Sequence, residues 1–139
     1  MYSDYNIDMT DIMLIEPDTI LGAMYKKTLQ RAGYKVGLQT NAQTAIHALD
    51  RDIPKLLILE IQLGEHNGIE FLYELHSYPD WHNIPIIINS LIPADVLGIN
   101  SDAAKELGIV EILYKPKVTL DILLSKSSDY VKVENASTK

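Results

Sequence analysis

Five polar side chains in this sequence each stand at or just after the end of an apolar run, and together they could form one site. They are Glu16, Asp18, Glu60, Ser90 and Lys115. One acid after a strand carries little information, but an acid pair, an acid, a hydroxyl and a lysine in this order are a specific set. In an open α/β sheet, ligands bind and chemistry occurs at the carboxyl ends of the strands. The set therefore predicts a polar functional site at that edge.

The apolar runs predict the strands that must position these residues. Residues 56–59 (Leu-Leu-Ile-Leu) are bounded by Pro54 and Gly64, which indicates a strand buried on both faces, as in a parallel sheet covered by helices. Further strands are predicted over 12–15, 34–39, 85–90 and 109–114, and apolar stripes at helical spacing separate them. Five βα units with right-handed crossovers predict an α/β fold, a doubly wound parallel sheet with helices on both faces.

Capping residues indicate where three of the helices begin. Asp18, Asn41 and Thr119 each precede a helical stripe, and Gly33 follows the end of the first stripe. For Asp18, a cap is favoured over a role in the polar site, because a capping carboxylate is already engaged.

The segments between the central strand and the last one are less regular. Residues 64–68 and 78–83 are predicted as loops, and residues 91–108 as a broken helix whose best part is 101–107. For the aromatic residues of the second loop and its preceding helix, Tyr78 and Trp81 among them, core packing is favoured over a docking surface.

Composition narrows the class of protein. A chain of 139 residues that is 47% hydrophobic suits one domain with a sizeable core. A net charge of −7 would repel a phosphate backbone, so direct binding to nucleic acid is not expected. The absence of cysteine excludes disulfides and thiolate sites. No apolar run reaches the ~20 residues of a membrane span, and the first residues lack the basic start of a signal peptide, so we expect a cytoplasmic protein without membrane contact.

The ordered strand ends resemble the receiver domain of two-component response regulators. The resemblance covers about residues 11–131, so we expect a flexible arm over 1–10 and a polar tail over 132–139. The matching features are residues 14–18 (Leu-Ile-Glu-Pro-Asp), residues 59–63 (Leu-Glu-Ile-Gln-Leu) with Gly68 behind them, Pro85 leading to Ser90, and Gly108 leading to Lys115-Pro116.

The resemblance implies a flavodoxin-like, CheY-like sheet with strand order 2-1-3-4-5 and a place in a histidine kinase phosphorelay. In receivers, an aspartate at the third strand end accepts a phosphoryl group, and acids at the first strand end hold Mg²⁺. A threonine or serine contacts the phosphoryl group and a lysine pairs with it. The matching positions here hold Glu60, Glu16, Ser90 and Lys115, and Ile112 stands where the family often has a switch aromatic.

This chain departs from the family pattern where the chemistry takes place. The Glu60 carboxylate is one methylene further from the backbone than that of aspartate, whereas in-line attack tolerates misplacement of only ~1 Å. Pro17 occupies the position of the second acid of the pair and supplies no ligand for Mg²⁺. We therefore expect an atypical receiver, or pseudo-receiver, that has lost phosphorylation and kept the scaffold.

The first functional hypothesis is a non-enzymatic signalling module that acts through protein contacts, with no catalytic residue and no cofactor. Glu60 and Lys115 are expected to form a standing ion pair near the surface of the cleft, which imitates a phosphoryl group in part. The expected partner is a histidine kinase, an output domain or another signalling protein. Residues 95–105 and 120–130 are the candidate surface for that partner or for a homodimer.

Two other hypotheses remain open. In the second hypothesis the chain is a phosphorylatable receiver in which Glu16 and Asp18 hold Mg²⁺, with Glu60 as a further candidate ligand. An unrelated flavodoxin-like binder of a cofactor or nucleotide ranks last, because no glycine-rich loop follows the first strand and the acids there would repel phosphate. Ser90 and Glu60 could also be ordinary residues at strand ends.

Overall fold

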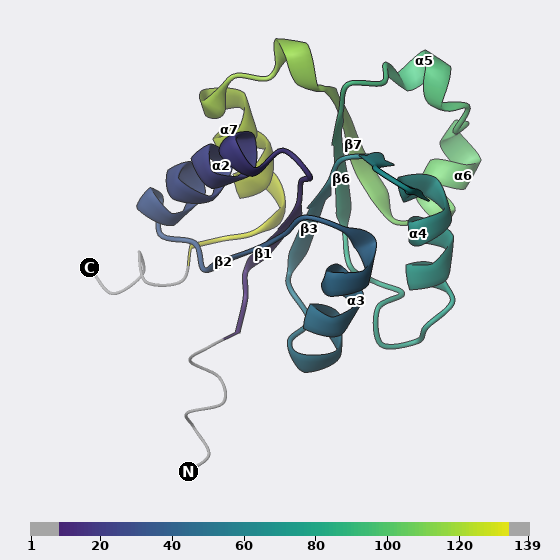
Figure 1. The fold of residues 1–139 in the computed structure, drawn as a ribbon, viewed down its shortest axis with the longest axis horizontal. Helices are drawn as coiled ribbons and strands as arrows, with labels where there is room; N and C mark the ends of the chain where they lie inside the picture. The colour runs from purple at the N-terminus through teal and green to yellow at the C-terminus, as the bar shows by residue number, and fades with distance from the viewer. Residues whose placement is uncertain (1–8, 134–139) are drawn as a thin grey trace.

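The strands expected from the apolar runs form one parallel sheet. The computed structural model describes residues 9–133. Its main sheet has the order β2-β1-β3-β6-β7, and every neighbouring pair is parallel (Figure 1). The strands are β1 Ile12–Ile15, β2 Val36–Gln39, β3 Leu56–Leu59, β6 Ile86–Ser90 and β7 Ile109–Tyr114. Numbered within this sheet, the order is 2-1-3-4-5, which confirms the expected fold class.

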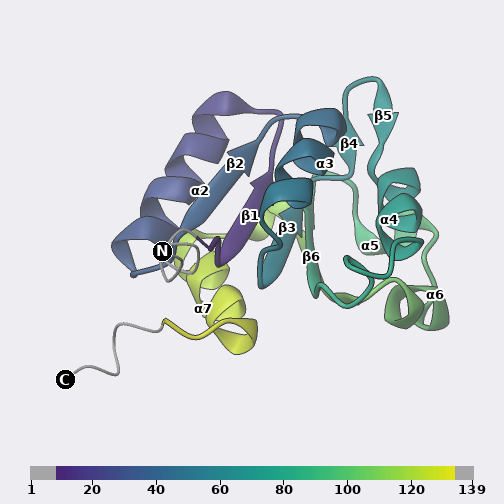
Figure 2. The same ribbon diagram turned by 90° about the horizontal axis from the view of Figure 1, so that it is seen from below.

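Helices cover both faces of the sheet (Figures 1 and 2). Two helices, α2 Thr19–Arg31 and α7 Leu120–Tyr130, pack on one face. The other face is covered by α3 Ala42–Arg51 and α4 Gly68–His76, with the short helices α5 Ala94–Leu97 and α6 Ser101–Glu106 towards the β7 edge. The region 91–108 is therefore a broken helical segment, as expected from its sequence.

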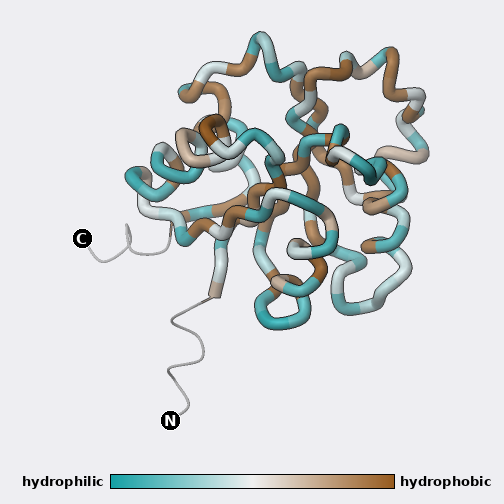
Figure 3. The backbone as a smooth tube through the Cα atoms, viewed as in Figure 1, coloured by the Kyte–Doolittle hydropathy of each residue, from teal (hydrophilic) through white to brown (hydrophobic). Residues whose placement is uncertain are grey.

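Alternate residues of each central strand supply the two cores. Leu14 and Ile58 pack with the side chains of α2 and α7, whereas Met13, Leu57 and Leu59 pack with those of α3 and α4. All four residues of β1 and of β3 are buried, because helices lie on both sides of them. In Figure 3, hydrophobic, brown segments accordingly run along the central strands.

Side-chain caps fix the starts of most helices. Asp18, Asn41 and Thr119 accept hydrogen bonds from backbone N–H groups of α2, α3 and α7, as the sequence predicts. Asn67 and Asn100 cap α4 and α6 in the same way, and neither was foreseen. Each cap satisfies a backbone donor that has no partner within its helix.

Two short elements were not expected from the sequence. The predicted loop over 64–68 is part of a small antiparallel hairpin of β4 Gln62–Leu63 and β5 His66–Asn67. Gly64 allows its turn because it adopts a φ of +72°. Directly after β7, Lys115 and Pro116 begin the 3-10 helix η1 Lys115–Lys117. Both elements follow strand ends, so they help to shape the site.

The expected arm and tail fall for the most part outside the described residues. Of the arm, the structure describes residues 9 and 10, and Thr10 is held by hydrogen bonds from its backbone N and Oγ1 to Asp52 Oδ2, at 2.8 and 2.7 Å. Of the tail, it describes residues 132 and 133. Within residues 9–133, no helix has the length and apolar character needed to cross a membrane.

Candidate functional site

Four of the five predicted side chains meet at the carboxyl edge of the sheet. The strand register pairs Ile15 with Leu59 and Leu59 with Ile88, so the residues that follow these strands come together. The backbone N–H of Glu60 donates to Ile15 O at 3.0 Å, which fixes the start of the loop after β3 beside β1. Glu16, Glu60, Ser90 and Lys115 are joined there by direct hydrogen bonds.

Glu60 is the centre of this cluster. Its Oε2 accepts hydrogen bonds from Ser90 Oγ at 2.5 Å and from the backbone N–H of Gln62 at 3.0 Å. Its Oε1 accepts from Lys115 Nζ at 2.6 Å and from the backbone N–H of Leu91 at 3.2 Å. Each carboxylate oxygen therefore has two donors. These donors satisfy a carboxylate that is almost fully buried, with 3% of Glu60 exposed, and they hold its side chain in one orientation.

Lys115 joins the two buried acids. Its Nζ lies 2.7 Å from Glu16 Oε1 and 2.6 Å from Glu60 Oε1. Glu16 Oε2 also accepts a hydrogen bond from the backbone N–H of Asp18 at 3.0 Å. Two carboxylates and one ammonium leave the cluster with one net negative charge. The sequence analysis placed the Glu60–Lys115 pair near the surface of the cleft; this was wrong, since 9% of the lysine side chain and 3% of the glutamate side chain are exposed.

Hydrogen bonding keeps Glu60 and Lys115 ionised although both are buried. Burial raises the pKa of the Glu60 carboxyl, but hydrogen bonds from Lys115, Ser90 and the Gln62 backbone outweigh it, so the pKa lies below its ordinary value. Burial likewise lowers the pKa of Lys115, and the hydrogen bonds to Glu16 and Glu60 reverse this and raise it. Both groups are therefore charged at neutral pH.

The fifth residue, Asp18, lies outside the cluster. Its Oδ1 accepts from the backbone N–H of Leu21 at 2.9 Å, so its carboxylate caps α2 and its side chain is not part of the buried network. Pro17 offers no side-chain oxygen. Within the described part of the chain, no three His, Asp or Glu side chains are grouped so that they could hold a metal ion. The residues present therefore do not fit a resident Mg²⁺, which prefers octahedral oxygen coordination.

Ile112, at the expected switch position, is only partly buried and packs against the core on the α3 and α4 face. It is aliphatic and carries no hydrogen-bonding group, so a polar contact of its side chain with the cluster is not available.

A second polar contact was missed by the sequence analysis. Asn89 lies within β6 and donates from Nδ2 to the hydroxyl of Tyr25 on α2 at 3.1 Å. Asn89 is 2% exposed and Tyr25 is 3% exposed, and Asn89 Oδ1 has no hydrogen-bond partner among the described residues. An asparagine inside an otherwise apolar strand was the available signal, since a buried amide needs a partner.

Comparisons with known proteins agree with this geometry. The family model of the response regulator receiver domain matches residues 12–126. An uncharacterized 14.6 kDa protein in the sodA1 3′ region of Leptolyngbya boryana is 26% identical over 113 residues, which are 81% of this chain and 84% of that protein. The alginate biosynthesis transcriptional regulatory protein AlgB of Pseudomonas putida is 28% identical over 94 residues. That match covers 67% of this chain and only 21% of AlgB, so this chain spans about a fifth of that regulator.

Solved structures share the fold. A two-component response regulator from Clostridium difficile has a TM-score of 0.75 and 25% identity, with 88% of this chain and 95% of that chain covered. The receiver domain of the sensor histidine kinase PA1611 of Pseudomonas aeruginosa, described with a magnesium ion in its active-site cleft, has a TM-score of 0.70 and 19% identity. There, 88% of this chain and 97% of that chain are covered. The family match, together with the five-stranded sheet and its strand order, identifies this chain as a member of the response regulator receiver domain family, which serves two-component signalling.

Proposed function

We propose that this receiver signals without phosphorylation, with the Glu60 carboxylate in the place of a phosphoryl group. The observation that carries this proposal is that Glu60 accepts hydrogen bonds from both Ser90 and Lys115. These residues stand at the positions whose side chains contact the phosphoryl group in the family. The extra methylene of glutamate carries the charge further into the cleft, towards both donors.

The imitation of a phosphoryl group is partial. A phosphoryl group carries about −1.5 to −2 charges and three acceptor oxygens, whereas Glu60 supplies one charge and two oxygens. Both oxygens are fully used, because backbone N–H groups of Gln62 and Leu91 complete their hydrogen bonds. The carboxylate thus holds together the ends of β3, β6 and β7 as a permanent ligand.

The same contacts weigh against phosphorylation of Glu60. An attacking carboxylate oxygen would first have to give up two hydrogen bonds, one of them to a buried ammonium or to Ser90. A magnesium ion would need ligands from Glu16, which already binds Lys115 and the Asp18 backbone, and from Asp18, which caps α2. Pro17 cannot contribute. A receiver with Mg²⁺ on Glu16 and Asp18 therefore ranks second.

Signalling would then depend on protein contacts rather than on catalysis. The surface of α5, α6, β7 and α7 carries several large apolar side chains that are more than one third exposed: Val96, Val110, Leu120, Ile122 and Tyr130. It contains residues 95–105 and 120–130, and we propose it as the contact surface for an output domain, a kinase or a second copy. A permanently held cleft can bias this surface only if Glu60 binds its donors better in one conformation than in the other.

The test uses beryllofluoride, which mimics a phosphoryl group, and a variant that restores the family residues. Amide NMR spectra of the wild-type chain and of P17D/E60D are recorded with Mg²⁺ and then with beryllofluoride. We expect no saturable change around Glu60, Ser90 and Lys115 in the wild type, and saturable binding in the variant, where an acid pair and a shorter acceptor are present. The variant thus acts as a positive control on the same scaffold.

A complementary variant tests whether the charge of Glu60 biases the contact surface. E60Q keeps the shape of the side chain and removes the charge, so we expect amide shifts in α5, β7 and α7 as well as in the cleft. Saturable beryllofluoride binding by the wild type would overturn the proposal in favour of a phosphorylatable receiver. Shifts confined to the cleft in E60Q would show that Glu60 does not control the surface.

A further inference from the structure

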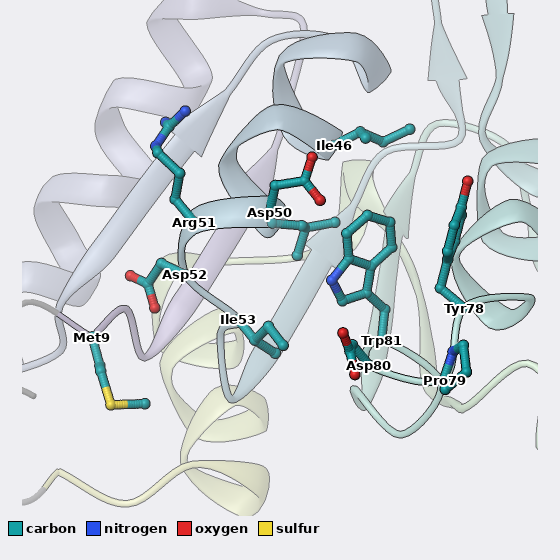
Figure 4. Close-up of a pocket in the computed structure, with 11 residues that line it drawn as sticks. Met9, Ile46, Asp50, Arg51, Asp52, Ile53, Tyr78, Pro79, Asp80 and Trp81 are labelled. Atoms are coloured by element: carbon teal, nitrogen blue, oxygen red, sulfur yellow. The ribbon is translucent and has the colours of Figure 1, made fainter. Parts of the chain in front are cut away.

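A groove lies at the amino ends of the strands, on the opposite edge of the sheet from the cleft of Glu60. It has a volume of about 1040 Å³ and is bordered by the end of α3, the segment before β3 and the loop before β6 (Figure 4). Pockets of this size accommodate a small ligand or several side chains of a peptide. None of the residues that line this groove belongs to the cluster of Glu60.

The floor of the groove is aromatic and apolar. The rings of Tyr78 and Trp81 contact each other with centroids 4.8 Å apart and planes tilted by 52°. Trp81 is 8% exposed and packs into the core, whereas Tyr78 is 46% and Ile53 39% exposed. Core packing thus holds for the tryptophan, as expected from the sequence, while Tyr78 and Ile53 offer apolar surface to an incoming group.

The rim of the groove is acidic. Asp50 and Asp80 lie on opposite sides of the indole in Figure 4, and both are exposed. Neither carboxylate forms a hydrogen bond or ion pair within residues 9–133. Asp52 adds a third carboxylate, whose Oδ2 already accepts hydrogen bonds from the backbone N–H and the hydroxyl of Thr10. The one cation of the lining, Arg51, points away from the aromatic pair in Figure 4.

We propose that this groove binds a segment of a partner protein in which a lysine or arginine stands next to an aliphatic or aromatic residue. The apolar residue would pack on Tyr78 and Ile53, and the cation would lie between Asp50 and Asp80. The charge and the aromatic floor both favour this occupant, because a cation near an aromatic ring gains further from the ring's negative face. The inference concerns a different edge of the sheet and does not depend on the role of Glu60.

Charge makes other occupants poor matches. A second copy of this chain carries a net charge of −7 and would be repelled. Residues 1–8 of the chain itself contain Asp4 and Asp8 and no lysine or arginine. Nucleic acid would bring its phosphates against the three carboxylates of the rim. A basic peptide segment is the occupant that complements both the charge and the apolar floor.

The experiment selects peptides from a random phage-displayed dodecapeptide library on the full chain. Counter-selection uses D50K/D80K, in which the two unpaired rim carboxylates become ammonium groups. The matched control is E65K/E70K, which makes the same change in net charge at two exposed acids that do not line the groove. Amide NMR spectra of both double variants without peptide establish that they fold as the wild type does.

We expect the selected pool to be enriched in Lys and Arg next to aliphatic or aromatic residues. The selected peptide should shift the fluorescence of Trp81, the only tryptophan of the chain, and the amides of residues 46–53 and 78–81 in a saturable way. Its affinity should fall at least tenfold in D50K/D80K and change little in E65K/E70K. The proposal would be overturned if no peptide were enriched or if acidic peptides were selected. It would also be overturned by an equal loss of affinity in both double variants, which would indicate non-specific attraction.

Discussion

The Ser90 hydroxyl donates to the Glu60 carboxylate across 2.5 Å and joins the ends of two neighbouring strands, β3 and β6. Ser90 Oγ also accepts a hydrogen bond from the backbone N–H of Ile92 at 3.1 Å. One hydroxyl thus connects the acid of the cleft to the segment that leads into α5. Two consecutive hydrogen bonds thus connect Glu60 to the backbone that leads into the proposed contact surface.

Replacement of Ser90 by alanine is expected to loosen this connection. Glu60 loses one donor and the Ile92 N–H loses its acceptor, and hydrogen bonds to charged groups contribute about 1.5–3 kcal/mol. We expect urea unfolding to give a loss of roughly that size, with amide shifts over residues 91–97. The control is S128A, because the exposed Ser128 hydroxyl bonds, among residues 9–133, only to the Ser125 backbone. Equal stability of S90A and S128A would contradict the importance of the Ser90–Glu60 contact.

The stability of the domain should depend on pH through Glu60. Its pKa in the folded chain lies below the ordinary value of 4.5, so the native state binds fewer protons than the unfolded state near that value. The stabilisation is therefore present above pH 4.5 and is lost as the pH falls through the folded-state pKa. The free energy of unfolding of the wild type should exceed that of E60Q at neutral pH, and the difference should shrink in acid. A difference that stays constant down to the lowest pH at which both variants fold would contradict this.

Replacement of Lys115 by methionine should be more damaging than removal of either acid. Glu16 and Glu60 would then be two buried carboxylates without a cation, and breaking a buried pair in this way costs about 3–5 kcal/mol. We expect K115M to lose stability by about that amount at neutral pH and to recover part of it in acid, where a carboxyl becomes protonated.

A double variant separates the charge effect from lost packing of the lysine chain. K115M/E16Q leaves one buried carboxylate instead of two, so we expect it to be more stable than K115M, although it carries one more substitution. Urea unfolding of wild type, K115M, E16Q and K115M/E16Q gives the coupling between the two sites. Additive losses would show that Lys115 contributes packing alone.

The apolar runs predicted the five strands of the main sheet, and the resemblance to receiver domains implied their order. Four of the five residues expected in the cleft meet there, because each follows a buried apolar run. The sequence did not predict how deep the cluster lies. Burial of Glu60 depends on the hairpin of β4 and β5 and on backbone N–H groups of Gln62 and Leu91, and no side-chain pattern encodes these.

The groove, and the partner of Asn89 inside the core, could not be foreseen for the same reason. The groove joins Met9, Ile53 and Trp81 from segments that are far apart in sequence. The bond between Asn89 and Tyr25 links a strand to a helix 64 positions away. Local periodicity gives the face on which a side chain lies, but only the packed fold decides which remote side chain it contacts.

Gly68 is expected to be intolerant of any side chain, because α4 begins directly against the loop after β3. A Cβ at this position would lie 2.7 Å from Ile61 Cα and 2.8 Å from Ile61 O, both backbone atoms that cannot rotate away. The backbone N–H of Gly68 also donates to Ile61 O at 2.8 Å, so the two segments cannot separate without losing that bond. G68A should therefore lose about 1–3 kcal/mol, the usual cost of overpacking.

The matched control for this variant is G37A in β2. Among the described residues, a Cβ at Gly37 would meet only the Thr10 side chain, at 3.8 Å and beyond, which is an ordinary contact distance. We expect urea unfolding to give a clear loss for G68A and little change or a gain for G37A, since alanine lowers the entropy of the unfolded chain. Because Ile61 directly follows Glu60, G68A should also shift the amides of Glu60 and Gln62. A G68A variant as stable as the wild type, with those amides unmoved, would show that the loop after β3 is free to adjust and does not hold Glu60 in place.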